Sequence, residues 1–187
     1  MLTAHFKKWL NNDMTTIWTS PTIIDQYAES GAELVHIPWN NSQFDAVISP
    51  DSTSLGTQGV LTHISKSPRV DETNKTYFLS ANGYNFNDLP NIVSGITLRL
   101  TTNRYGRISD DTIQIIVNGE PAGENLASKS VDPIKIYGGV NDLWGIDNLS
   151  VSDLQNSNFG VLIRFKSHPH YPHKDGANIY AIELQIH

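Results

Sequence analysis

The densest group of possible metal ligands in this chain is a histidine-rich stretch near its C-terminal end. His168, His170 and His173 are interrupted by Pro169 and Pro172, in the loop expected between the last two strands. Neutral imidazoles at this spacing could converge on zinc or nickel, most readily across a symmetry axis. The two prolines, however, extend the backbone and separate alternate side chains. An exposed loop without a metal is therefore the competing interpretation, and both are kept.

A pair of adjacent carboxylates, Asp110-Asp111, is the next candidate for chemistry. We expect a solvated, charged turn at residues 103–111, in which adjacent side chains point apart and cannot share a substrate as a glycosidase pair does. A calcium role for Asp110, Asp111 or Asp142 is the alternative, because oxygen-rich loops suit that ion. The sequence has no glycine-rich phosphate loop, serine elbow or metalloprotease histidine pair. We therefore predict a protein that is not an enzyme and needs no cofactor.

Aromatic rings near turns are a third possibility, since they could form a platform for a sugar. Trp39, Tyr84 and Tyr105 lie near predicted turns. Aromatic side chains of β-sandwiches mostly pack in the core or at sheet edges, which is the favoured interpretation for all three. Carbohydrate binding is kept as an alternative.

Composition excludes several classes of protein. The chain has no cysteine, so it cannot form disulfides or cysteine-based metal sites, and it suits a reducing cytoplasm. Its formal net charge is −6, and no basic run extends beyond Lys7-Lys8, which argues against direct binding of nucleic acid. No signal-peptide core is present, and no run approaches the ~20 apolar residues of a membrane span. We expect a protein that is soluble when made.

Alternating apolar and polar residues predict many short strands joined by polar turns. The plainest are residues 92–100, 112–117, 159–166 and 180–186, while residues 60–64 are a weaker candidate inside a polar stretch. Asn118-Gly119 is a strong hairpin signal. This pattern predicts an all-β, antiparallel β-sandwich, jelly-roll-like in outline. Its expected core contains Ile96, Leu98, Leu100, Ile113, Ile115, Trp144, Phe159, Val161, Ile163, Ile182 and Leu184.

The first residues of the chain have a different pattern. Leu2, Phe6, Trp9 and Leu10 recur at helical spacing, with Lys7-Lys8 on the other side, and predict a short helical arm. A helix this short is marginal alone, so its apolar stripe must dock on its own domain or on a neighbouring subunit. The domain prediction is an N-terminal arm and connector over residues 1–21, followed by a β-sandwich over residues 22–187.

The sandwich is expected to be organised around residues 137–166. Trp144 brings a large apolar ring, and Gly145 removes the side chain beside it, which fits an indole lying against backbone at a sheet corner. Further along, Arg164 and Lys166 share a strand face that we expect to reach solvent at its far end. The predicted structural anchors are Trp144, Gly145, Phe159 and Gly160.

An ordered set of motifs carries a family resemblance. The motifs are Ile92-x-x-Gly95-Ile96, Ser109-Asp110-Asp111, Tyr137-Gly138-Gly139, Asp142-Leu143-Trp144-Gly145 and Asn158-Phe159-Gly160-Val161. Together they resemble a β-sandwich domain of virion proteins of tailed bacteriophages, over residues 77–187, about half of the chain.

The resemblance implies a non-enzymatic structural component, made in the host cytoplasm and located in the virion. Capsid, neck, tail and baseplate all stay open as its place in the particle. Its implied partners are other virion proteins and copies of itself, without direct contact to nucleic acid or membrane. The alternative is a carbohydrate-binding attachment module of the virion.

Overall fold

The computed structural model describes most of the predicted sandwich but not the predicted arm. The arm residues Leu2, Phe6, Trp9 and Leu10 lie outside the described residues, as do His168, His170 and His173. The described residues are 16–29, 36–39, 60–64, 75–130, 132–167 and 175–187.

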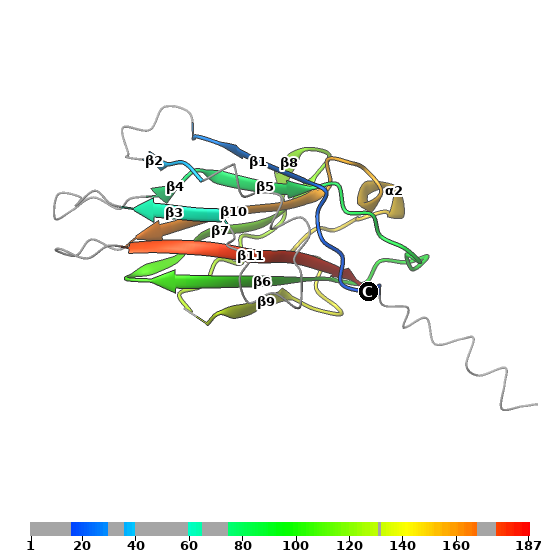
Figure 1. Ribbon diagram of the computed structural model, residues 1–187. Coiled ribbons are helices and arrows are strands. Elements are labelled where there is room, and N and C mark those ends of the chain that lie inside the picture. Colours follow the sequence, from blue (N-terminus) through cyan, green and yellow to red (C-terminus); the bar gives the residue numbers. More distant parts are fainter. Residues whose placement is uncertain (1–15, 30–35, 40–59, 65–74, 131, 168–174) are drawn as a thin grey trace, which may run out of the picture.

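Across the described residues the protein is an all-β sandwich of two sheets, in agreement with the prediction (Figure 1). Every strand pairing is antiparallel except the short parallel pair of β2 with β4. The larger sheet contains β1 (Ile23–Tyr27), β2 (His36–Ile37), β4 (Lys75–Thr76), β5 (Phe78–Asn82), β7 (Ile108–Val117), β8 (Glu120–Ala122) and β10 (Gly160–Ser167). The smaller sheet contains β3 (Val60–Ile64), β6 (Ile96–Tyr105), β9 (Ile134–Gly138) and β11 (Asp175–Ile186).

The strands with the plainest alternation form the centre of each sheet. β10 pairs with β5 and β4 on one side and with β7 on the other, and β11 lies between β3 and β6. All eleven predicted core residues are buried between the sheets. Burial of these branched and aromatic side chains is the main favourable term that holds the sheets together.

Two predicted element boundaries are wrong. Residues 103–111 are not a charged turn, because β6 continues to Tyr105 and β7 begins at Ile108, which leaves only Gly106-Arg107 to connect them. The strand predicted from residue 92 begins at Ile96 instead, and Ile92 lies in the preceding loop with its side chain 75% exposed. In neither place do polar and apolar residues alternate regularly, so the sequence does not mark where the strands begin and end.

The residues just before the larger sheet are held by the C-terminal strand. The Thr16 backbone N–H donates to the Ile186 carbonyl at 2.8 Å, and Thr19 bridges to Leu184. The described end of the stretch predicted as a connector therefore lies along the last residues of β11, close to the C-terminus (Figure 1). No helix in the described part of the chain is long and apolar enough to span a membrane.

Candidate functional site

Trp144 is held by packing and by three hydrogen bonds in the loop between β9 and the short helix α2 (Val151–Leu154). Trp144 and its contacts with Ile96, Asp142 and Glu124 are called the Trp144 corner below. The indole is fully buried, and its Nε1–H donates to the Ile96 carbonyl at 3.0 Å. The Trp144 backbone N–H donates to Asp142 Oδ1 at 2.7 Å, and the Trp144 carbonyl accepts from the Glu124 N–H at 2.6 Å. Trp144 has φ of 58°, a left-handed conformation that is strained for a bulky residue. Packing and hydrogen bonds together hold this strained conformation.

Two glycines allow close contacts around these anchors, one with the indole ring and one with backbone. A Cβ on Gly138 would lie 2.4 Å from the Trp144 indole nitrogen, and a Cβ on Gly160 would lie 2.0 Å from the Ala81 carbonyl. Phe159, just before Gly160, is fully buried and packs edge-on against Phe86. Trp144, Phe159 and Gly160 are therefore closely packed, but the glycine beside the indole is Gly138 and not the predicted Gly145, which lies against the Glu124 side chain instead.

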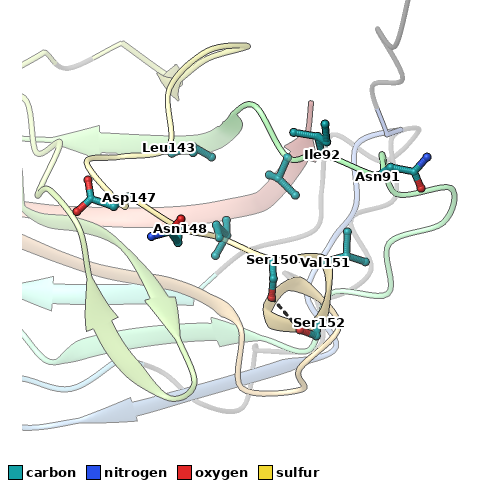
Figure 2. A pocket seen from close by; sticks show the side chains of 10 residues that line it. Asn91, Ile92, Leu143, Asp147, Asn148, Ser150, Val151 and Ser152 are labelled. Carbon is teal, nitrogen blue, oxygen red and sulfur yellow. Dashed lines mark hydrogen bonds between the residues drawn. The ribbon is translucent and has the colours of Figure 1, made fainter. Parts of the chain in front are cut away.

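A hollow of about 520 Å³ lies on the outer side of this corner, between two loops (Figure 2). One wall comes from the β5–β6 loop, and the other comes from the β9–α2 loop and the first residues of α2. Leu143, next to the buried Trp144, belongs to the second wall. The described lining residues are Asn91, Ile92, Val93, Leu143, Asp147, Asn148, Leu149, Ser150, Val151 and Ser152.

A capping box at the start of α2 fixes the part of the second wall that Ser150, Val151 and Ser152 form. Ser150 Oγ accepts from the Asp153 N–H at 3.2 Å, and Asp153 Oδ2 accepts from the Ser150 N–H at 2.9 Å. The Ser150 and Ser152 hydroxyls are also hydrogen-bonded to each other at 2.7 Å (Figure 2). The Ser150 hydroxyl also donates to Asp153 Oδ2 at 2.6 Å, and this bond, together with the one from the Ser150 N–H, lowers the pKa of Asp153. The serines are therefore engaged within the protein itself.

A second polar cluster is buried between the sheets, at Asp110. The Asp110 carboxylate is completely buried. Its Oδ2 accepts from Lys135 Nζ at 2.8 Å and from the Tyr137 hydroxyl at 2.7 Å. Oδ1 forms an ion pair with Arg104 Nη1 at 2.8 Å, and the Ser128 backbone N–H adds a further bond to Oδ2. The prediction of a solvated carboxylate here is wrong, because two cations and a phenol compensate the buried charge.

The electrostatics of this cluster follow from those partners. Burial alone would raise the pKa of Asp110, but Arg104, Lys135, Tyr137 and Ser128 together hold that pKa below its ordinary value. Burial, together with the negative charge of Asp110, raises the pKa of the Tyr137 phenol. At neutral pH the carboxylate is thus ionised and the phenol neutral, while burial lowers the pKa of Lys135 against the opposing pull of Asp110.

Asp111 lies on the other side of the larger sheet. Thr112 pairs with Arg164 and Asp110 pairs with Phe165, so Asp111 is the extra residue of a β-bulge. Its carboxylate accepts from Arg164 Nε at 2.6 Å. Burial alone would raise the pKa of Asp111, but Arg164, Lys75 and Lys166 together lower it below its ordinary value.

Arg164 lies in the covered part of the strand face that was predicted to reach solvent only at its far end. Its guanidinium lies 3.9 Å from the centre of the Phe78 ring and also pairs with Glu29 at 2.6 Å. Of the two cations predicted to share this strand face, Arg164 is buried, whereas Lys166 is about a third exposed. The end of the face that reaches solvent therefore begins at Lys166.

These contacts bear on the calcium and sugar-platform alternatives. A calcium ion at Asp110 or Asp111 would have to displace the arginine and lysine partners, and Asp142 already accepts a backbone N–H. In the described part of the chain, no group of three or more histidine and acidic side chains could hold a metal. Trp39 and Tyr84 are 3% and 4% exposed, so neither can serve as a platform, whereas Tyr105 is partly exposed.

Sequence reasoning missed both the hollow and the buried cluster. The hollow joins two loops that are far apart in the chain, and its one local signal is the Ser150-x-x-Asp153 capping box. For the cluster, the available signal was Lys135 between two isoleucines, a cation in an otherwise apolar run. Searches of protein-family models, curated proteins and solved structures found no match to this chain.

Proposed function

We propose that this protein is a non-enzymatic structural component of a tailed-bacteriophage virion, which assembles in multiple copies through protein–protein contacts. Two features support the proposal. One is the order of motifs over residues 77–187, which resembles virion β-sandwich domains. The other, which carries the argument, is an exposed apolar surface on the edge strand β9.

The β9 face consists of Ile134 and Ile136, which point away from the core. Their side chains are 57% and 56% exposed, although isoleucine is among the residue types most often buried. Val140, in the turn that follows β9, is 55% exposed as well. Exposed apolar side chains that gather on one element are typical of contact surfaces.

The surroundings of the β9 face are those of an interface rim. In the β6 register, Ile136 lies opposite Arg99, which forms a two-bond ion pair with Glu183 at 2.7 Å. The Arg99 guanidinium also lies over the Trp18 ring, with its central carbon 4.3 Å from the ring centre. An apolar centre bordered by satisfied polar groups is the usual composition of a protein–protein contact.

Covering the β9 face would contribute useful binding energy. Fully burying an isoleucine side chain contributes about 1.5–3 kcal/mol, and roughly half of that remains available for each of these two. A gain of about 1.5–3 kcal/mol per contact is weak for a single pair but becomes large when many symmetric copies share it.

The test compares the double variant Ile134→Ser/Ile136→Ser with Ile23→Ser, a matched isoleucine that is 47% exposed on β1 of the other sheet. We expect the double variant to remain folded but to lose self-association in sedimentation experiments and incorporation into purified particles. The Ile23→Ser control should keep both properties. Normal incorporation of the double variant would refute the role of the β9 face, and absence of the wild-type protein from purified virions would refute the structural function itself.

A further inference from the structure

We infer that the hollow between the β5–β6 and β9–α2 loops is a binding site for an uncharged saccharide. This inference goes beyond the proposed structural role and does not depend on the β9 face. It rests on the size of the hollow, on the chemistry of its walls and on the rigidity of its support.

The size suits a small sugar unit. Pockets for small ligands commonly enclose about 300–1,000 Å³, and the hollow has about 520 Å³. Its two walls come from Asn91–Val93 on one side and from Leu143 and residues 147–152 on the other, so a ligand would be held between them (Figure 2).

The polar side chains of the walls match the hydroxyl groups of a sugar. Asn91, Asp147 and Asn148 are exposed, and within the described residues their side chains make no hydrogen bond. Two amides and one carboxylate offer both donors and acceptors, and a sugar hydroxyl can satisfy either kind because it donates and accepts. An apolar ligand would leave these groups desolvated and unpaired, which is unfavourable.

The charge of the walls argues against an anionic ligand. Among the described lining residues, Asp147 is the only ionisable side chain, and none is lysine, arginine or histidine. Phosphate, sulfate or a carboxylate would meet one negative charge without a compensating cation. A neutral polyhydroxyl ligand avoids this repulsion and uses the carboxylate as an acceptor.

The apolar part of the hollow gives a sugar ring a surface for its C–H groups. Ile92 projects from the β5–β6 loop with its side chain 75% exposed, the largest exposure among the large apolar residues of the described chain. Leu143 and Val151, on the opposite wall, are half-buried. Water is displaced from these side chains when a ligand packs on them, which adds affinity without a directional requirement.

The support of the hollow is preorganised. The Trp144 corner fixes Leu143, and the capping box between Ser150 and Asp153 fixes the start of α2. A rigid site loses little conformational entropy on binding, so a few hydrogen bonds to a sugar can produce measurable affinity.

The experiment uses the full chain. An array of uncharged mono- to tetrasaccharides is screened first, and the strongest binder is then titrated into isotopically labelled protein by NMR. The variants Asp147→Asn, Asn148→Ala and Ile92→Ala remove one group each from the walls. Asn103→Ala is the matched control, because Asn103 is an exposed asparagine near the other end of β6.

We expect shifts confined to residues 91–93 and 143–152, about a tenfold or greater loss of affinity in Asp147→Asn and Asn148→Ala, and no loss in Asn103→Ala. Failure of every neutral saccharide to bind would overturn the inference, as would binding that the wall variants leave unchanged. Displacement of the sugar by a synthetic peptide of residues 1–13, with tighter binding of that peptide, would assign the hollow to the chain's own N-terminal segment instead. The Ile134→Ser/Ile136→Ser variant should bind the saccharide normally, so failure here and failure of the structural proposal are distinguishable.

Discussion

Replacement of Trp144 is the most informative single perturbation of this fold. The indole is fully buried, so Trp144→Ala removes its packing and leaves a cavity, at a cost of about 3–5 kcal/mol. The lost indole hydrogen bond adds little to this, because the Ile96 carbonyl also accepts from the Gly139 N–H at 3.1 Å and is not left unpaired.

The backbone conformation of Trp144 makes the comparison with glycine decisive. At φ of 58°, alanine is strained and glycine is not, and the difference amounts to about 1 kcal/mol. At an ordinary helix or strand position, a glycine variant would be less stable than an alanine variant by about 0.5–1 kcal/mol. Here we expect the reverse order, with Trp144→Gly more stable than Trp144→Ala by about 1 kcal/mol.

Urea and thermal unfolding, both followed by circular dichroism, measure the stability lost in Trp144→Ala and the difference between the alanine and glycine variants. For a chain of this size, about 2–4 °C of melting temperature corresponds to 1 kcal/mol, so Trp144→Ala should melt about 6–20 °C below the parent protein. A loss of only about 1 °C would show that the indole contributes no core packing. A Trp144→Gly variant less stable than Trp144→Ala would refute the argument from backbone strain.

Two further predictions concern the buried cluster and the N-terminal arm. Asp110→Asn leaves Arg104 and Lys135 buried without their shared anion and should cost about 3–5 kcal/mol in urea unfolding, while the same change at the exposed Asp88 should cost little. The pKa values of Asp110 and Asp111 in the folded protein lie below the ordinary value of 3.8. The two ionised carboxylates therefore stabilise the fold above that pH, and this contribution is lost as the pH falls through the lowered pKa values. Asp110→Asn should reduce this acid sensitivity. Deletion of residues 1–13 should leave the sandwich folded, as judged by its melting curve, but weaken incorporation into particles or a homo-oligomer. A large loss of global stability in a monomeric protein whose arm resists proteolysis would show that the arm packs on its own domain.

The strands that were predictable are those in which one face is continuously apolar. Along β6, Ile96, Leu98 and Leu100 alternate with polar residues, and the alternation correctly assigns these three to the core. Strand period and burial agree there because no irregularity interrupts the pleat.

The first residues of β7 could not be predicted, because a bulge at Asp111 changes the face on which the residues before it lie. Ile113 and Ile115 face the core at odd positions, but the extra residue at Asp111 moves the inward positions to Asp110 and Ile108. A sequence of Ser, Asp, Asp and Thr is typical of a turn, and nothing local reveals that Arg104 and Lys135 lie opposite. The hollow escaped prediction for a related reason, since contacts between distant loops decide its shape.

The orientation of β9 links the buried cluster to the proposed interface. If β9 were turned over, Ile134 and Ile136 would enter the core, but Lys135 and Tyr137 would leave Asp110. Burial of the half-exposed isoleucines would contribute about 1.5–3 kcal/mol, while removal of partners from a buried carboxylate costs about 3–5 kcal/mol. The observed orientation is therefore favoured by a small margin in the isolated chain. A partner that covers the β9 face would widen that margin, because the ion cluster and the isoleucine burial would then stabilise the same orientation.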